Sequence, residues 1–469
     1  MTRPQPQRPQ VHAFGDDALG DHDGVGLAEL IRSGERSSRE LVEAVIARID
    51  AVDPVLHGLK VGDYERARVA RFDTGAVLAG VPTFIKDNTD VAGLPTNHGS
   101  ACFVAKPAKK DSPVTTQYLS SGMVVVGKTK LPEFGFNAAT EYRFDEPVRN
   151  PWNTDHSPGA SSGGSGALVA AGVVPIAHAN DGGGSIRIPA ACNGLVGLKP
   201  SRGRFLDGPQ AKSLPLNVVV EGVVTRTVRD TAAFAAAAER YAAAVGMKPI
   251  GHVQGPGSAP LRIGLVIDSP AGAVTDAQTR VAIERTAKTL ESFGHRVEPA
   301  DIPVTQQFAD DFVTYWGMLA FLSTRTARLL IDRHFDSKRA DGLTLGLRSN
   351  FQRHLLRVPG AIRRLKQTQA IYEAAFSGYD VVLSPVLAHV PPKIGWLSPQ
   401  QPFEQLMERL TNYVAFTPLN NVSGGPAISV PAGLSVENVP IGAHLSGPIG
   451  SEATLLELAY ALEEAGWGV

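Results

Sequence analysis

The chain is poor in the features that mark disulfide-rich, metal-binding and nucleic-acid-binding proteins. It has only two cysteines, Cys102 and Cys192, in 469 residues. Two cysteines are too few for a disulfide framework, and they do not stand at a metal-ligand spacing, so a reducing, cytoplasmic location is expected. Lys and Arg total 45 against 46 Asp and Glu. The resulting net charge of −1 offers no basic footprint for nucleic acid.

Long apolar runs are also missing. No stretch of about 20 apolar residues occurs, so no transmembrane segment is expected. Residues 1–24 are polar and contain several prolines, without the apolar core of a secretory signal. We expect them to form a loosely ordered tail that precedes the folded part of the chain.

Several catalytic and cofactor motifs are absent. The sequence has no G-x-x-x-x-G-K-[ST] or G-x-G-x-x-G phosphate loop, no H-E-x-x-H zinc motif and no G-x-S-x-G nucleophile elbow. The twelve histidines are scattered, and His156 and His178 are expected to be packing residues because no carboxylate partner is evident for either. We therefore expect neither a metal nor a cofactor.

Hydrophobic patterns predict alternating strands and helices, which is typical of a sheet covered by helices. Helices are expected at 26–50, where Ser37 and Glu40 have capping-box spacing, and at 227–245, 275–293, much of 310–376 and 451–465. Strands are expected at 81–85, 123–127, 261–267, 295–299, 381–385, 427–431 and 441–445. Residues 131–158 are predicted to be a long loop that, with residues 204–218 and 305–376, forms the walls of a substrate pocket.

Two glycine-rich clusters stand out in the middle of the chain. Residues 159–164 read GASSGG, and residues 181–185 read DGGGS. Glycine lets a backbone approach a ligand closely, so each cluster could present N–H groups to a bound group. Each also holds a serine, which is a weak nucleophile unless a base takes its proton.

Lys86 is the base that the sequence offers, although its position alone leaves two interpretations open. It follows the apolar run 81–85 directly. A strand-end lysine usually reaches solvent, which is the interpretation that position alone favours. A buried lysine can instead lose its proton near neutral pH and act as a base.

These motifs resemble the amidase signature family. The segments GASSGGSGA and NDGGGSIRIP place Ser161 and Ser185 24 positions apart, as the family's two serines are, and Ile85-Lys86-Asp87-Asn88 matches its lysine motif. Further matches extend the resemblance from about residue 25 through nearly the whole chain; they lie at 130–135, 150–153, 197–200, 222–226, 426–431 and 440–442. Within the family the chain is most similar to bacterial amidases of the 6-aminohexanoate-cyclic-dimer hydrolase type, mycobacterial amidases included.

The resemblance implies a fold and a set of roles. The fold would be one α/β/α domain over 25–469, with a large mixed, mostly parallel twisted sheet covered by helices on both sides. Ser185 would be the nucleophile that forms the acyl-enzyme, Lys86 the base, and Ser161, with a cis peptide bond before Ser162 or close to it, the bridge between them. Backbone N–H groups would form the oxyanion hole, contributed by Gly182, Gly183, Gly184 and Ser185. Asp181 and Arg187 would hold the loop.

The implied substrate is a linear or cyclic carboxamide of small size, cleaved at its C–N bond. The sequence departs from the commoner residues of the family at Ala160, Asn180 and Cys192-Asn193. These departures affect the expected pocket shape but none of the three catalytic positions. Two alternatives remain: a glutamine-dependent amidotransferase subunit that needs partner chains, and a binding protein without catalysis on the same fold. A homodimer is compatible with the sequence, and the basic segment 348–366 is expected to be a solvated face rather than a surface for an acidic partner or for lipid.

Overall fold

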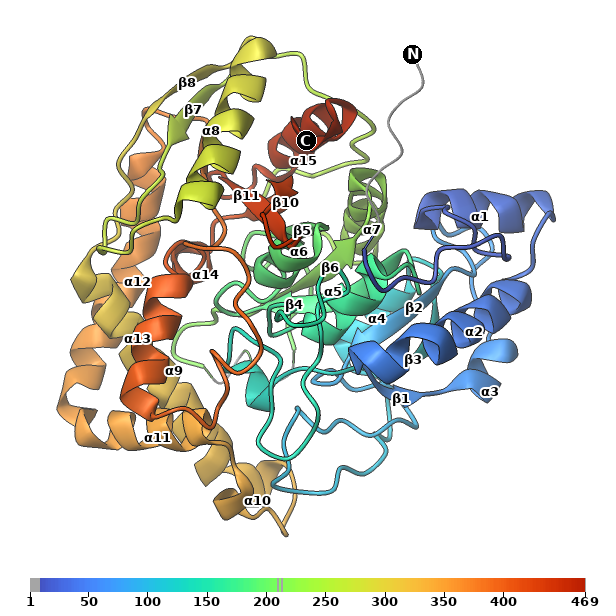
Figure 1. Ribbon diagram of the computed structural model, residues 1–469, viewed down its shortest axis with the longest axis horizontal. Coiled ribbons are helices and arrows are strands. Elements are labelled where there is room, and N and C mark those ends of the chain that lie inside the picture. Colours follow the sequence, from blue (N-terminus) through green and yellow to red (C-terminus); the bar gives the residue numbers. More distant parts are fainter. Residues whose placement is uncertain (1–8, 209–210, 212–213, 469) are drawn as a thin grey trace.

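A computed structural model describes residues 9–208, 211 and 214–468, so residues 1–8 of the expected tail lie outside the described part (Figure 1). An eight-stranded sheet runs through the centre of the molecule. Its strands, in spatial order, are β4 (Ile176–Asp181), β6 (Val220–Thr225), β5 (Val196–Lys199), β10 (Ala427–Leu434), β11 (Pro440–Ser446), β9 (Val381–Pro385), β7 (Arg262–Leu265) and β8 (Arg296–Pro299).

The mixed character of the sheet is confirmed, but its expected mostly parallel pairing is wrong. Neighbours from β4 across to β9 all pair antiparallel, and β7 alone pairs parallel, with β9 and with β8. The β-α-β unit at 261–299 does form the expected parallel pair. The antiparallel part arises because β10 and β11 form a hairpin whose two outer edges pair antiparallel with β5 and β9.

A second, smaller sheet lies beside the first and has the order β1-β3-β2. Its strands are β1 (Leu59–Gly62), β3 (Val124–Thr129) and β2 (Pro82–Lys86). Strands β2 and β3 are parallel, with Lys86 opposite Thr129, and α4 (Pro113–Leu119) lies between them in the chain. The strand expected at 81–85 is therefore confirmed as an edge strand, and Pro82 is its first residue, where proline is tolerated.

Helices surround both sheets. The N-terminal helices are α1 (Gly24–Ser33), α2 (Ser38–Leu56), α3 (Tyr64–Arg68), α5 (Gly163–Ala170), α6 (Arg187–Asn193), α7 (Val228–Tyr241) and α8 (Ala277–Ser292). The C-terminal helices are α9 (Gln306–Arg325), α10 (Ala327–Leu330), α11 (Gly342–Arg353), α12 (Val358–Ala375), α13 (Phe403–Tyr413), α14 (Pro418–Ser423) and α15 (Glu452–Glu464). Figure 1 shows α9, α11, α12 and α13 grouped at one side of the large sheet.

The predicted capping box of α2 is present. The Glu40 backbone N–H donates to the Ser37 hydroxyl, and the Ser37 N–H donates to the Glu40 carboxylate at 2.7 Å.

Residues 9–23 differ from the expected loose tail. Leu19 is buried in the main core, and the Asp17 carboxylate accepts a hydrogen bond from Arg48 at 2.6 Å. This segment packs on the domain because it supplies both an apolar and a charged contact.

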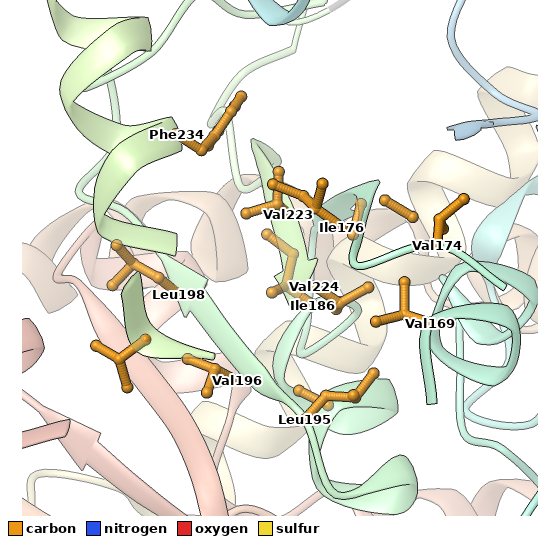
Figure 2. Packing of buried hydrophobic residues seen from close by; sticks show 14 of the residues in the cluster. Val169, Val174, Ile176, Ile186, Leu195, Val196, Leu198, Val223, Val224 and Phe234 are labelled. Carbon is orange, nitrogen blue, oxygen red and sulfur yellow. The ribbon is translucent and has the colours of Figure 1, made fainter. Parts of the chain in front are cut away.

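The main hydrophobic core lies behind the glycine-rich segment. Figure 2 shows side chains from α5, β4, β5, β6 and α7 gathered in it; the labelled ones include Val169, Ile176, Val196, Val223 and Phe234. Ile186, directly after the second glycine cluster, is also part of this core. The loop that holds Ser185 is thus anchored to the rigid interior. In the described part of the chain, no helix is both long and apolar enough to cross a bilayer.

Candidate active site

Strands β2 and β4 belong to different sheets but lie against each other, and this contact brings the two chemical motifs together. The Thr83 hydroxyl donates to the Ile176 carbonyl at 2.9 Å. Further along both strands, the Lys86 backbone N–H donates to Nδ1 of His178 at 3.3 Å. The ends of both strands therefore meet at one point, where Lys86 ends β2 and Asp181 ends β4.

Lys86 is completely buried, so the expectation of a solvent-reaching lysine is wrong. Its Nζ lies 2.7 Å from Ser161 Oγ and 2.7 Å from Asn180 Oδ1. Within the described residues no carboxylate forms an ion pair with it. Burial lowers the Lys86 pKa to about 7, against the opposing influence of the more distant Glu221 and Asp181 carboxylates. Near neutral pH this amine is available in its unprotonated form.

Ser161 lies directly before α5, in a bend of the first glycine cluster. The cis peptide bond expected near Ser162 joins Ala160 to Ser161. The neighbouring Ser162 hydroxyl donates to the Ser185 carbonyl at 2.6 Å. The two glycine clusters are thereby tied together, and Ser161 and Ser185 line the same cavity.

The loop from Asp181 to Arg187 is held by a buried ion pair. Asp181 Oδ2 accepts from Nε of Arg187 at 2.9 Å, and both side chains are fully buried. Burial by itself would raise the Asp181 pKa, but Arg187 and other donors hold it well below its usual range. The Arg187 guanidinium also donates to Asn421 at 2.7 Å. These contacts support the structural role expected for Asp181 and Arg187.

The backbone N–H groups of the second cluster are not equivalent. Gly184 donates its N–H to Oδ1 of Asp181 at 2.7 Å, so this group is already used by the loop itself. The N–H groups of Gly182, Gly183 and Ser185 form no hydrogen bond within the described part of the chain. Gly184 therefore does not fit the oxyanion hole that the resemblance implies, and the candidate donors narrow to the other three.

A cavity of about 470 Å³ opens beside these residues. Ser161, Ser185, Gly182 and Gly183 line its reactive end. The predicted walls are present: residues 131–158 contribute Phe134 to Ala138, residues 204–218 contribute Val218, and residues 305–376 contribute residues of α9. Helix α13 and the segment after it, which the sequence did not indicate, complete the cavity with residues 408, 410–412, 414 and 415.

Other residues that the sequence singled out have different places. His178 is buried beneath Lys86, and its Nε2 lies 3.0 Å from the Glu221 carboxylate on β6. This carboxylate was missed because it lies 43 positions away in the chain. Cys192 is buried, and burial raises the pKa of its thiol to about 12, which excludes a thiolate nucleophile at neutral pH.

Comparison with known proteins agrees with this geometry. The profile of the amidase family matches residues 40–456. The chain belongs to the amidase family. AmiC of Mycobacterium leprae, whose name describes it as an amidase, is 50% identical over 458 residues, with 97% of each chain covered. The 6-aminohexanoate-cyclic-dimer hydrolase of Paenarthrobacter ureafaciens is 33% identical over 477 residues, with 94% of each chain covered.

Solved structures extend the similarity to the whole fold. A structure of 6-aminohexanoate cyclic dimer hydrolase matches this amidase with a TM-score of 0.86 at 31% identity, covering 96% of this chain and 98% of the other. The expected family and its branch are thus confirmed, and the chain is a hydrolase that acts on amide C–N bonds.

Proposed function

We propose that this amidase cleaves a small linear or cyclic carboxamide through an acyl-enzyme on Ser185, with Ser161 and Lys86 as its proton relay. The observation that carries the proposal is the contact of 2.7 Å between Ser161 Oγ and the Nζ of a fully buried lysine without a carboxylate partner in the described residues. A neutral amine in this position accepts a proton from the serine hydroxyl.

In the first step, Ser185 Oγ attacks the amide carbon and gives its proton to Ser161, while the Ser161 proton passes to Lys86. The negative charge that develops on the carbonyl oxygen is stabilised by the free N–H groups of Gly182, Gly183 and Ser185. The C–N bond then breaks, and the proton held by Lys86 returns through Ser161 to the leaving nitrogen. A water molecule releases the acyl group by the same route in reverse.

The Ser161 and Ser185 hydroxyls must approach each other for this relay. Among the described hydrogen bonds none joins the two directly. Catalytic hydrogen bonds often tighten only when substrate is bound, and Ser162 already holds the two segments together through the Ser185 carbonyl.

The charges among the residues that line the cavity are relevant to the amidotransferase alternative. Glutamine carries an ammonium and a carboxylate group close to its amide. Among the described residues that line the cavity, Glu408 alone is charged, and it lies exposed on α13. No described cation there would hold the carboxylate of glutamine. A glutaminase assay on the isolated chain is expected to show no activity above that of the Ser185→Ala variant.

Replacing Ser185 tests the proposed function. Ser185→Ala is expected to lower kcat on every amide substrate by about 10⁴-fold or more, because removal of a nucleophile disables the whole relay. A fluorophosphonate probe should label the wild type at Ser185 and leave the variant unlabelled. Cys192→Ala is the matched control, since the buried thiol is not ionised, and it should keep both labelling and turnover.

Normal turnover by Ser185→Ala would contradict the proposal. A wild-type protein that neither cleaves amides nor reacts with the probe would favour the binding-protein alternative.

A further inference from the structure

One wall of the cavity is a row of aromatic side chains on α9. Phe308, Phe312 and Trp316 follow one another at four-residue spacing and therefore lie on one face of the helix. The ring centroids of Phe308 and Phe312 are 6.5 Å apart, and those of Phe312 and Trp316 are 6.4 Å apart. All three line the cavity, so they form a continuous apolar platform.

The platform reaches the reactive end of the cavity. A Cβ atom placed on Gly183 would lie 3.3 Å from the Cζ atom of Phe312, so the ring packs directly against the proposed oxyanion loop. A substrate whose carbonyl oxygen binds at Gly182 and Gly183 must place its adjoining atoms beside this ring. The side chain of Phe312 is therefore positioned to select substrates by what is attached to the amide.

Polar groups in the cavity walls are largely occupied by other contacts. The Tyr315 hydroxyl donates to the Leu216 carbonyl. The Asn137 amide donates to the Leu397 carbonyl at 2.7 Å, and its oxygen accepts from the Ala138 N–H at 2.8 Å. Glu408 is the charged residue among the described residues that line the cavity, and it lies exposed. The described lining therefore offers no buried partner for a charged substrate group, and burying an unpaired charge is strongly unfavourable.

We propose that this amidase selects amides whose acyl group is uncharged and apolar, and that Phe312 with Trp316 is the platform on which that group lies. The inference rests on the proposed function, because it places the amide at Ser185. Aromatic and straight alkyl acyl groups both fit a flat platform of this kind, whereas an acyl group that ends in a carboxylate would bury its charge without a partner.

A series of p-nitroanilides with one leaving group tests this selection. The acyl groups are acetyl, hexanoyl, phenylacetyl and succinyl. Each buried methylene is worth about fourfold in binding, so kcat/KM should rise at least about tenfold from acetyl to hexanoyl. Phenylacetyl should match hexanoyl, and succinyl should fall below acetyl. Equal values across the series, or a preference for succinyl, would overturn the proposal.

Substitutions on α9 test whether Phe312 is responsible for the selection of the acyl group. Phe312→Ala should reduce the ratio of hexanoyl to acetyl kcat/KM several-fold. Phe321→Ala is the matched control, because Phe321 lies on the same helix but packs on Phe351, at a ring distance of 5.2 Å, outside the cavity lining. The control should leave the ratio unchanged. A ratio that falls equally in both variants would overturn the assignment to Phe312.

The acyl selection and the amidase mechanism can be refuted separately. Turnover that disappears in Ser185→Ala but shows no apolar preference would refute the acyl selection and leave the amidase mechanism intact. Turnover that persists in Ser185→Ala would refute the mechanism itself.

An independent observation concerns Asn180, which stands where the family more commonly has threonine. Its Oδ1 lies 2.7 Å from Lys86 Nζ, and its backbone oxygen lies 3.5 Å from the same atom. Asn180 and Asn88 form a reciprocal amide pair with both N–O distances at 3.2 Å. In this pair the Oδ1 atom of Asn180 lies next to both the Asn88 amide nitrogen and the lysine.

The arrangement controls the direction of the lysine lone pair. A neutral amine has two N–H groups and one lone pair. The two oxygens of Asn180 accept the two N–H groups, which leaves the lone pair directed at Ser161 Oγ. We infer that Asn180 is a positioning residue that aims Lys86 at Ser161, with Asn88 as its support.

The readout is the acidic limb of the plot of kcat/KM against pH, because replacing a residue with a merely structural role would not shift the pH at which this limb falls. Other charged or titratable groups around Lys86 stay constant in the test: Asp181, Glu221, His178 and the Asp87–Lys128 pair. Asn180→Asp places a carboxylate beside Lys86, stabilises the ammonium form and should move the limb to higher pH. Asn180→Leu removes an acceptor and should move the limb to lower pH, with a plateau at least tenfold lower.

Asn180→Thr retains an oxygen and should be closest to the wild type. Thermal unfolding of each variant shows whether it is folded at the assay temperature. Limbs at the same pH in the folded Asp and Leu variants would overturn the inference.

Discussion

Lys86 and Lys128 lie in neighbouring strands of the same small sheet, and both side chains are completely buried, yet their partners differ. Lys128 forms an ion pair with Asp87 at 2.8 Å and donates to the Pro95 carbonyl and the Thr96 hydroxyl. Lys86 has neutral oxygens around it, from Ser161 and Asn180. Lys128 pairs in register with Ile85, the residue before Lys86, so the two lysines point to opposite faces of the sheet.

The comparison shows that burial alone does not make a lysine a base. Burial lowers the pKa of both residues, but in Lys128 the adjoining Asp87 carboxylate opposes the change directly. Through these contacts the Lys128 side chain joins β3 to the segment before α4. Lys86 has no such contact among the described residues, so its amine can exchange a proton near pH 7.

The largest expected effect is the loss of activity in Lys86→Met. Methionine has a similar length but no lone pair that accepts a proton, so kcat should fall by about 10³-fold or more. The fall should be measured on the substrate that the wild type cleaves best, beside Lys128→Met as the matched control. A folded Lys86→Met variant that kept a tenth of the wild-type kcat would remove Lys86 from the mechanism.

The second effect is on stability and should appear in Lys128→Met. This change leaves the Asp87 carboxylate buried without its partner, which typically costs about 3–5 kcal/mol of unfolding free energy. Urea unfolding measures the cost. The fraction that remains folded should keep a kcat within a few-fold of the wild type, because Lys128 does not touch the cavity.

Adding Asp87→Asn to Lys128→Met should recover part of the stability, because the unpaired charge is then removed. If the single variant were as stable as the wild type, the ion pair would not be the element that distinguishes the two lysines.

A smaller effect is the pH dependence of stability that Lys86 imposes. Its pKa is about 7 in the folded protein and about 10.5 when unfolded. The unfolded chain therefore binds more protons between these values, so this lysine favours folding more as pH rises from 7 to 10. Relative to Lys86→Met, the wild type should be least stable near pH 6 and should gain stability towards pH 10. If the difference in denaturant midpoint between the wild type and Lys86→Met stayed constant across this pH range, it would contradict the lowered pKa of Lys86.

The motifs allowed the three proposed catalytic positions to be named before the fold was known, because the two serines lie in one segment and Lys86 stands in a short motif of its own. The burial of Lys86 could not be predicted in the same way. Its position after a strand, taken alone, favours a solvent-reaching lysine, and it is the packing of β4 on β2 that covers the side chain. That packing joins residues 92 positions apart, as in the contact of Lys86 with His178.

The strand directions show a similar limit. The helix expected at 275–293, between the strands at 261–267 and 295–299, correctly indicated the parallel pair β7–β8. The centre of the large sheet is antiparallel because β10, from the C-terminal part of the chain, inserts between β5 and β11. Gly184 shows a related limit, because its N–H looks free in a glycine run, whereas in the structure it donates to the carboxylate of Asp181, three residues earlier.

The proposed mechanism requires a neutral Lys86 that activates Ser185. The rate of Ser185 labelling by a fluorophosphonate probe measures this activation without an amide leaving group. Measured from pH 5 to pH 9, the second-order labelling rate should rise with a single midpoint near pH 7, where burial sets the Lys86 pKa. The residual labelling of Lys86→Met should show no such midpoint. A wild-type rate that is flat across this range, or a midpoint that persists in Lys86→Met, would contradict the account.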